Sequence, residues 1–195
     1  MKKKCLFKAL ISASVILTGL SANVIAADGT ITFQGTVTSS ACTTIIGATP
    51  AGGTASTTTI VNLPPVSADT LNATAGTYAG QTAFSIQLTG CKAAGSLSSV
   101  RATFTTARPA VGDNTVMSNT APSGAGNVAV AILTPQSVPI HLNGGTLIDP
   151  GETLPDAGGA AGPVTLNYVA AYKSLSTSVS PGPVTGIADY VISYF

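Results

Sequence analysis

The 195-residue sequence contains no tryptophan, a single histidine and very little charge. Charged residues make up only 8% of the chain, and the five tyrosines fall mostly in its last part. Nothing therefore indicates a cleft in which large aromatic rings stack on a sugar. One histidine and two thiols, those of Cys42 and Cys91, are also too few ligands for a closed zinc site.

The side chains needed for catalysis do not form a recognisable motif either. No G-x-S-x-G sequence occurs, and His141 lies among apolar residues in VPIHLNGG without a serine, cysteine or metal-binding partner in pattern. A structural or surface histidine is the favoured interpretation. Glu152 and Asp156 share one loop, where solvated carboxylates are favoured over a catalytic pair. The sequence predicts that the protein is not an enzyme and needs no cofactor or metal.

Residues 1–26 have the pattern of a signal peptide. A basic start precedes an apolar run over residues 9–20 that is too short to span a bilayer well. Val24 and Ala26 suit a signal-peptidase site, so we expect cleavage after Ala26, with cleavage after Ala27 as the close alternative. Removing four of the eight basic residues changes the net charge from +1 to 4 − 7 = −3. A basic surface for nucleic acid is therefore not expected.

The remaining 195 − 26 = 169 residues suit one all-β domain. No stretch has helical periodicity, and short β-branched runs alternate with Gly, Pro, Asn and Ser clusters, which favours a sandwich or barrel. We expect surface loops over residues 47–56 and 149–163. Strands are predicted over residues 57–63, 83–88, 100–105, 128–133, 138–142, 164–173 and 187–195.

Cys42 and Cys91 are the two cysteines that remain after export. A cysteine pair in an oxidising compartment predicts a disulfide, and a metal site is the weaker alternative. Closing a loop of this length stabilises a fold by about 4 kcal/mol.

Residues 27–37 predict a strand without a partner. Gly29, Ile31, Phe33 and Gly35 share one face by the period-two rule, in phase with Ala27, and no turn signal follows before Cys42. Glycine at two of these positions suits a strand that lies in a narrow groove of another molecule better than one that fills its own core. We therefore interpret residues 27–40 as an N-terminal donor arm and residues 41–195 as the domain that receives it.

Several motifs in this order resemble the chaperone–usher pilin family, in particular type 1 fimbrial major subunits. The arm carries Gly29-x-Ile31-x-Phe33-x-Gly35, and FSIQLTGC ends at the second cysteine of the pair. The stretches at residues 127–145 and 166–174 resemble the central hairpin and penultimate strand of the family. Gly182 is fourteenth from the C-terminus and Tyr194 is penultimate, as in the terminal motif of that family.

This resemblance implies an incomplete immunoglobulin-like sandwich that lacks its last strand and is completed by donor-strand exchange. Neighbouring subunits, a periplasmic chaperone and an outer-membrane usher are the implied partners, with a host receptor reached through the assembled fibre. The location implied is an extracellular fimbrium on a Gram-negative cell surface, reached through the periplasm. The residues implied as the donor strand are Ala27, Gly29, Ile31, Phe33 and Gly35. Those implied at the chaperone-binding groove edge are Gly182, Tyr190, Ile192 and Tyr194.

The function expected is that of a structural pilus subunit that polymerises head to tail for adhesion and biofilm formation. A minor adaptor subunit or an adhesin of the same pilus is the alternative. A tip adhesin would carry an additional receptor-binding domain and no donor arm, whereas the pattern here predicts an arm and one domain. A monomeric secreted β-sandwich is a third, weaker possibility.

Overall fold

The structure, a computed structural model, describes residues 41–50 and 56–195. The predicted signal peptide and the predicted donor arm, with Ala27, Gly29, Ile31, Phe33 and Gly35, lie outside these ranges. Among the described residues, no helix is long and apolar enough to cross a membrane.

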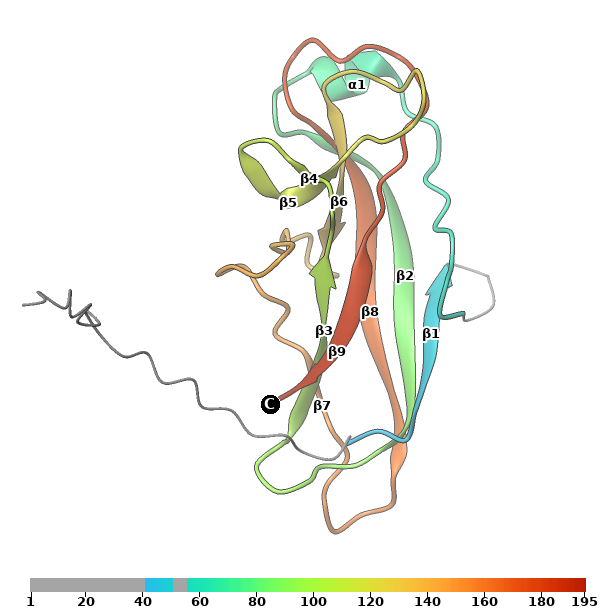
Figure 1. Ribbon diagram of the computed structural model, residues 1–195, viewed down its shortest axis with the longest axis vertical. Helices are drawn as coiled ribbons and strands as arrows, with labels where there is room; N and C mark the ends of the chain where they lie inside the picture. The colour runs from blue at the N-terminus through green and yellow to red at the C-terminus, as the bar shows by residue number, and fades with distance from the viewer. Residues whose placement is uncertain (1–40, 51–55) are drawn as a thin grey trace, which may run out of the picture. The chain divides into compact units, whose positions relative to one another are not determined.

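Two antiparallel sheets form the domain, which confirms the predicted all-β class (Figure 1). The larger sheet has the order β1-β2-β8-β6-β5-β4, and the smaller has the order β7-β3-β9. The strands of the larger sheet are β1 (Thr44–Pro50), β2 (Tyr78–Cys91), β8 (Gly162–Ser174), β6 (Val128–Leu133), β5 (Asp113–Ser118) and β4 (Pro109–Ala110). Those of the smaller sheet are β7 (Glu152–Thr153), β3 (Ser99–Thr105) and β9 (Asp189–Tyr194).

The main core contains alternating side chains from both sheets. Ile86 and Leu88 of β2 and Leu166 of β8 are at most 1% exposed, and they join a cluster with the inward residues of β3. Tyr168 packs edge-on against Phe104, with ring centroids 4.9 Å apart. Its hydroxyl accepts a hydrogen bond from the Ala102 amide and donates one to Asp149, so this buried polar group is satisfied.

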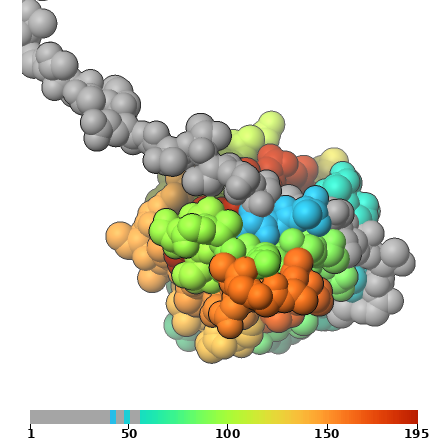
Figure 2. Space-filling view, turned by 90° about the horizontal axis from the view of Figure 1, so that it is seen from below, coloured from blue at the N-terminus to red at the C-terminus, as the bar shows by residue number. Residues whose placement is uncertain are grey.

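The predicted disulfide between Cys42 and Cys91 is present, and both residues are buried. It joins the residue before Thr43 to the last residue of β2, and backbone bonds lie on either side of it. The Thr43 amide donates to the Thr89 carbonyl, and the Lys92 amide donates to the Ala41 carbonyl. Figure 2 views this end, where the first residues of β1 lie beside the loops that follow β2 and precede β8.

Two predicted strands do not form the ladders expected of them, although Val61, Leu63, Ile140 and Leu142 pack in or against the core. Ile60 and Val138 are exposed. Residues 57–63 pair with no strand within residues 41–50 and 56–195, and Pro64 and Pro65 end the segment without donor groups for a ladder. Residues 138–142 form only an isolated bridge between Leu133 and Pro139. Ile140 and Leu142 are buried, but their amides donate to Ile132 and Asn114 respectively, so no continuous ladder forms.

The two predicted loops also contain regular structure. Residues 47–50 belong to β1, residues 51–55 lie outside the described ranges, and Ser56 bridges back to Ala48. The 149–163 segment contains β7 and the first residues of β8, and buries Leu154. The structure adds one helix that was not predicted, α1 (Ala68–Asn72), capped by Ser67 and burying only Leu71. Five residues are too few to produce a helical period.

Candidate functional site: an open sheet edge

The C-terminal strand β9 is hydrogen-bonded along one edge only. It pairs antiparallel with β3, from Val100 opposite Tyr194 to Thr105 opposite Asp189. In the part of the chain that the structure describes, no strand pairs with its other edge, since β9 ends the smaller sheet. An unpaired edge of this length presents backbone donors and acceptors that can pair with another chain.

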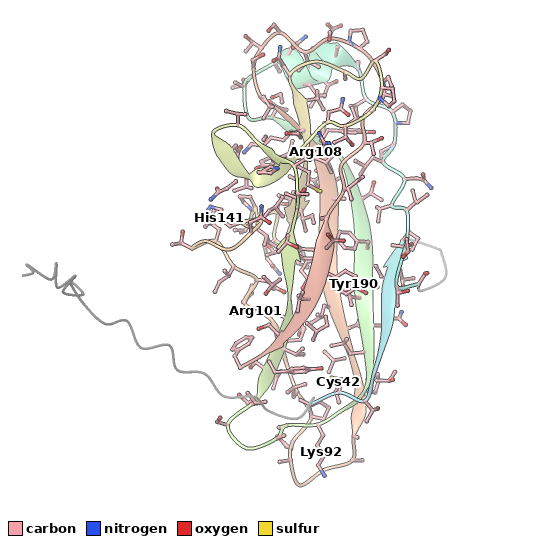
Figure 3. The ribbon with its side chains drawn as sticks, viewed as in Figure 1. Cys42, Lys92, Arg101, Arg108, His141 and Tyr190 are labelled. Carbon is pink, nitrogen blue, oxygen red and sulfur yellow. A yellow bond between two sulfur atoms is a disulfide. The ribbon has the colours of Figure 1, made fainter. Side chains whose placement is uncertain are left out.

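The inward face of β9 and of the residues leading into it is apolar but incompletely buried. Its side chains pack against the main core, yet each retains partial solvent exposure. These residues are Val184, Ala188, Tyr190, Ile192 and Tyr194, and Figure 3 labels Tyr190 on this strand. Inward-facing residues of β2, β3 and β8 are almost fully covered, so this row lacks part of its covering layer.

A second segment with the same property is formed by residues 57–66. Val61 and Leu63 also pack against the main core while remaining partly exposed. Ile60, which precedes them, is 75% exposed. Within the described ranges, the backbone of this segment forms no hydrogen bond with another backbone group. The Thr58 amide donates to the Ser56 hydroxyl, and the other backbone groups could pair with a further strand. We call the site between this segment and β9 the groove.

One end of the groove opens into a cavity of about 300 Å³ whose lining residues are mostly apolar. Leu63 and Val66 contribute from the 57–66 segment, Leu71 from α1, and Val184 from the residues before β9. Val128 and Val179 complete much of the apolar lining. This volume exceeds that of a single aliphatic side chain, so the end of the groove can admit part of an extended peptide.

Two glycines bring the chain that leads into β9 close to its neighbours. A Cβ at Gly182 would lie 2.5 Å from the Ala125 amide nitrogen, and one at Gly186 would lie 2.8 Å from Val130 Cβ. The amide of Ala125 donates to the Pro183 carbonyl nearby. Gly182 was predicted at the groove edge, and its packing explains a requirement for glycine without any external partner.

The groove is suited to binding through shape and backbone pairing. The inward row of the groove contains no charged side chain. Burial raises the pKa of the Tyr190 phenol above its usual value, so this side chain stays neutral. Among the described residues, no cluster of His, Cys, Asp and Glu could hold a metal ion. Glu152 and Asp156 are both exposed, as expected for solvated carboxylates, although Glu152 lies in β7 and not in a loop.

Of the predicted groove-edge residues, Tyr190, Ile192 and Tyr194 share the inward face of β9, whereas Gly182 precedes the strand and lines the cavity. Sequence reasoning did not find the other wall of the groove. The second wall was predicted as an ordinary paired strand. The alternation of Val61 and Leu63 indicated a core-facing segment, but it carried no information on whether another strand would pair with it.

The fold and the groove define a two-sheet, incomplete β-sandwich with an open C-terminal edge. A profile of the fimbrial protein family matches residues 31–195, and the chain belongs to that family. It is 38% identical to the major fimbrial subunit SMF-1 of Stenotrophomonas maltophilia over 179 residues, covering 90% of this chain and 96% of that protein. It is 32% identical to the F17 fimbrial protein of Escherichia coli over 185 residues, covering 92% and 94% respectively.

Solved structures similar to this chain include an antigen and type I fimbria protein of Burkholderia pseudomallei. The two sequences are 27% identical, and the TM-score is 0.49. The similarity covers 71% of this chain and 84% of the other.

Proposed function

We propose that this protein is a structural fimbrial subunit whose groove receives residues 27–37 of a neighbouring copy. The family and the two curated relatives, named as a major fimbrial subunit and a fimbrial protein, bear out a structural fimbrial role. The observation that supports the groove is the row of half-covered apolar residues along an unpaired edge of β9. A further strand would cover this row and satisfy the edge at once.

The arm and the groove have matching chemistry. Ala27, Gly29, Ile31, Phe33 and Gly35 alternate along the arm, and the inward residues alternate along β9 with the same period. Backbone pairing would supply affinity. Burial of the Ile31 and Phe33 side chains would each contribute about 1.5–3 kcal/mol to the free energy of binding. Because the donor and the acceptor lie on different parts of one chain, the contact is head to tail and propagates as a fibre.

The open edge of β9 also requires protection before assembly. A free edge of this kind aggregates, so a partner must cover it until the arm arrives. We assign this part to a periplasmic chaperone, which would contact Gly182, Tyr190, Ile192 and Tyr194, and the exchange to an outer-membrane usher. Residues 1–26 would direct export, and the assembled fibre would serve adhesion and biofilm formation at the cell surface. This role requires no catalytic group.

A rearranged chain tests whether the groove accepts the arm. Residues 27–40 are deleted and re-attached after Phe195 through a flexible linker, which supplies the arm at millimolar effective concentration. A matched chain carries Ile31→Ser and Phe33→Ser in the moved arm. We expect the unsubstituted chain to be a soluble monomer that melts roughly 10 °C or more above its matched variant. Equal melting temperatures would show that the arm does not enter the groove.

A minor adaptor subunit with the same arm and groove would pass that test, so a second measurement separates the two roles. Electron microscopy of a strain lacking this chain should reveal the loss of the fibre shaft. Fibres of normal length and number would instead indicate an adaptor or an adhesin.

A further inference from the structure

The loop that follows His141 closes around the imidazole of this residue. The Thr146 amide donates to His141 Nδ1 at 2.9 Å, and the Leu147 amide donates to the same nitrogen at 3.2 Å. The backbone amide of His141 in turn donates to the Leu147 carbonyl at 2.7 Å. Figure 3 labels His141 at the root of this loop. One unprotonated ring nitrogen therefore satisfies two backbone donors.

The backbone of the loop is shaped to make this contact. Asn143 and Gly144 have φ angles of 61° and 85°, in the left-handed region, and they turn the chain back toward the ring. A Cβ at Gly145 would lie 2.1 Å from His141 Nδ1, so only glycine allows the loop to approach the imidazole this closely. A Cβ at Gly144 would meet nothing within 4 Å.

The loop is fastened at both ends to the smaller sheet and its surroundings. The Asn143 amide donates to the Phe104 carbonyl, and the Asn143 side chain forms two hydrogen bonds with the backbone of Thr106. At the other end, Asp149 accepts hydrogen bonds from the Tyr168 hydroxyl and the Gly151 amide. Among the described residues, the side-chain hydrogen bonds made by residues 144–148 are the two that the His141 imidazole accepts.

We propose that protonation of His141 opens the loop at residues 144–148, which makes it an acid-sensitive surface element. An imidazolium carries a proton on both ring nitrogens and accepts no hydrogen bond, so the closed loop and the protonated ring exclude each other. Histidine is the side chain that changes charge between about pH 5 and pH 8. Opening would expose more of Leu147 and Ile148, which are already 39% and 52% exposed.

The segments that hold the loop carry three charged groups near His141 in the chain or fold, and these are hydrogen-bonded to other groups or form no hydrogen bond with the imidazole. Asp113 forms an ion pair with Lys173. It is the neighbour of Asn114, whose carbonyl accepts a hydrogen bond from the Leu142 amide. The Asp149 carboxylate accepts hydrogen bonds from Tyr168 and Gly151. Arg108 lies two residues after Thr106, to which the Asn143 side chain is hydrogen-bonded. Among the described residues, none of these charged groups forms a hydrogen bond or an ion pair with the imidazole.

Hydrogen–deuterium exchange of the full exported protein tests this proposal. Because histidine changes charge between about pH 5 and pH 8, the population of the open loop should rise as the pH falls through this range. After correction for intrinsic exchange, protection of the Thr146 and Leu147 amides should fall several-fold between pH 8 and pH 5. Protection of amides in β6 and β8 should not change, which excludes global unfolding.

Two pairs of variants distinguish the switch from a merely fragile loop. His141→Asn places an acceptor oxygen close to the position of Nδ1 and does not titrate, so the loop should stay protected at both pH values. His141→Ala should leave it unprotected at both. Gly145→Ala should open the loop at pH 8, whereas Gly144→Ala, which shares the left-handed backbone without the contact, should open it less. Unchanged protection in the unsubstituted protein, or an equal pH dependence in His141→Asn, would overturn the proposal.

Discussion

The larger sheet and the β9 edge use the same sequence pattern and reach different degrees of burial. Ile86 and Leu166 lie on strands paired on both sides, and they are 0% and 1% exposed. Tyr190 and Ile192 face the same core from a strand paired on one side, and both keep partial exposure. Alternation thus determines which face looks inward, whereas the number of neighbouring strands determines how completely that face is covered.

This difference divides the domain into a complete part and an incomplete part. The complete part contains the disulfide, the aromatic contacts and the central strands β2, β8 and β6, all of which are present without a partner chain. In the proposed function, a strand of a neighbouring subunit covers the incomplete part. Mutations in the first part should therefore destabilise the subunit always, and mutations in the second chiefly when the groove is filled.

Removing the disulfide should have the largest effect, and it should not depend on the arm. Cys42→Ala with Cys91→Ala releases a loop closed across 49 residues, which costs about 4 kcal/mol of unfolding free energy. Urea unfolding of the rearranged chain measures this loss, and the reduced unsubstituted chain serves as the control. A loss below about 1 kcal/mol would show that the complete part does not depend on this crosslink.

A matched pair of isoleucines tests the comparison directly. Ile86→Ala should cost about 2–5 kcal/mol whether or not the arm is joined to the chain, because its site is already filled. Ile192→Ala should approach that cost only in the rearranged chain. With the arm replaced by its Ile31→Ser, Phe33→Ser form, the Ile192→Ala cost should fall below about 1 kcal/mol, since solvent then reaches the side chain. Equal costs of Ile192→Ala in both backgrounds would contradict an open groove.

The smallest effect is expected at the ion pair between Lys173 and Asp113, whose charged atoms lie 2.6 Å apart. Partial burial by itself raises the pKa of Asp113, but hydrogen bonds from Lys173 and Thr115 outweigh it and lower the pKa below its ordinary value. Burial likewise lowers the pKa of Lys173, and the bond to Asp113 outweighs it and raises the pKa.

The pair should therefore contribute above the unfolded pKa of aspartate, near 4, and below that of lysine, near 10.4. Its contribution disappears as the pH falls through the lowered pKa of Asp113 or rises through the raised pKa of Lys173. Lys173→Gln should cost up to about 1 kcal/mol inside this window, equally with either form of the arm. Thermal unfolding across pH measures it, and a cost that depends on the arm would place this pair in the groove after all.

Much of the candidate site could be predicted from residue patterns, because they are local. The inward face of β9 followed from the alternation of Tyr190, Ile192 and Tyr194, and the motif pieces indicated the family. The second wall could not be predicted in this way, since Val61 and Leu63 alternate just as a paired strand would. Whether a segment finds a hydrogen-bonding partner depends on residues far away in sequence.

By itself, the sequence determined the β class and the faces that look inward, because the period of a strand repeats within a few residues. It also determined the cysteine pair, because two cysteines remain after the predicted signal peptide. The tertiary structure alone decided that residues 57–66 pair with no strand of the described residues, that one end of the groove opens into a cavity of about 300 Å³, and that His141 accepts hydrogen bonds from two backbone amides. Each of these depends on distances between segments that the chain brings together only on folding, and no local pattern encodes such distances.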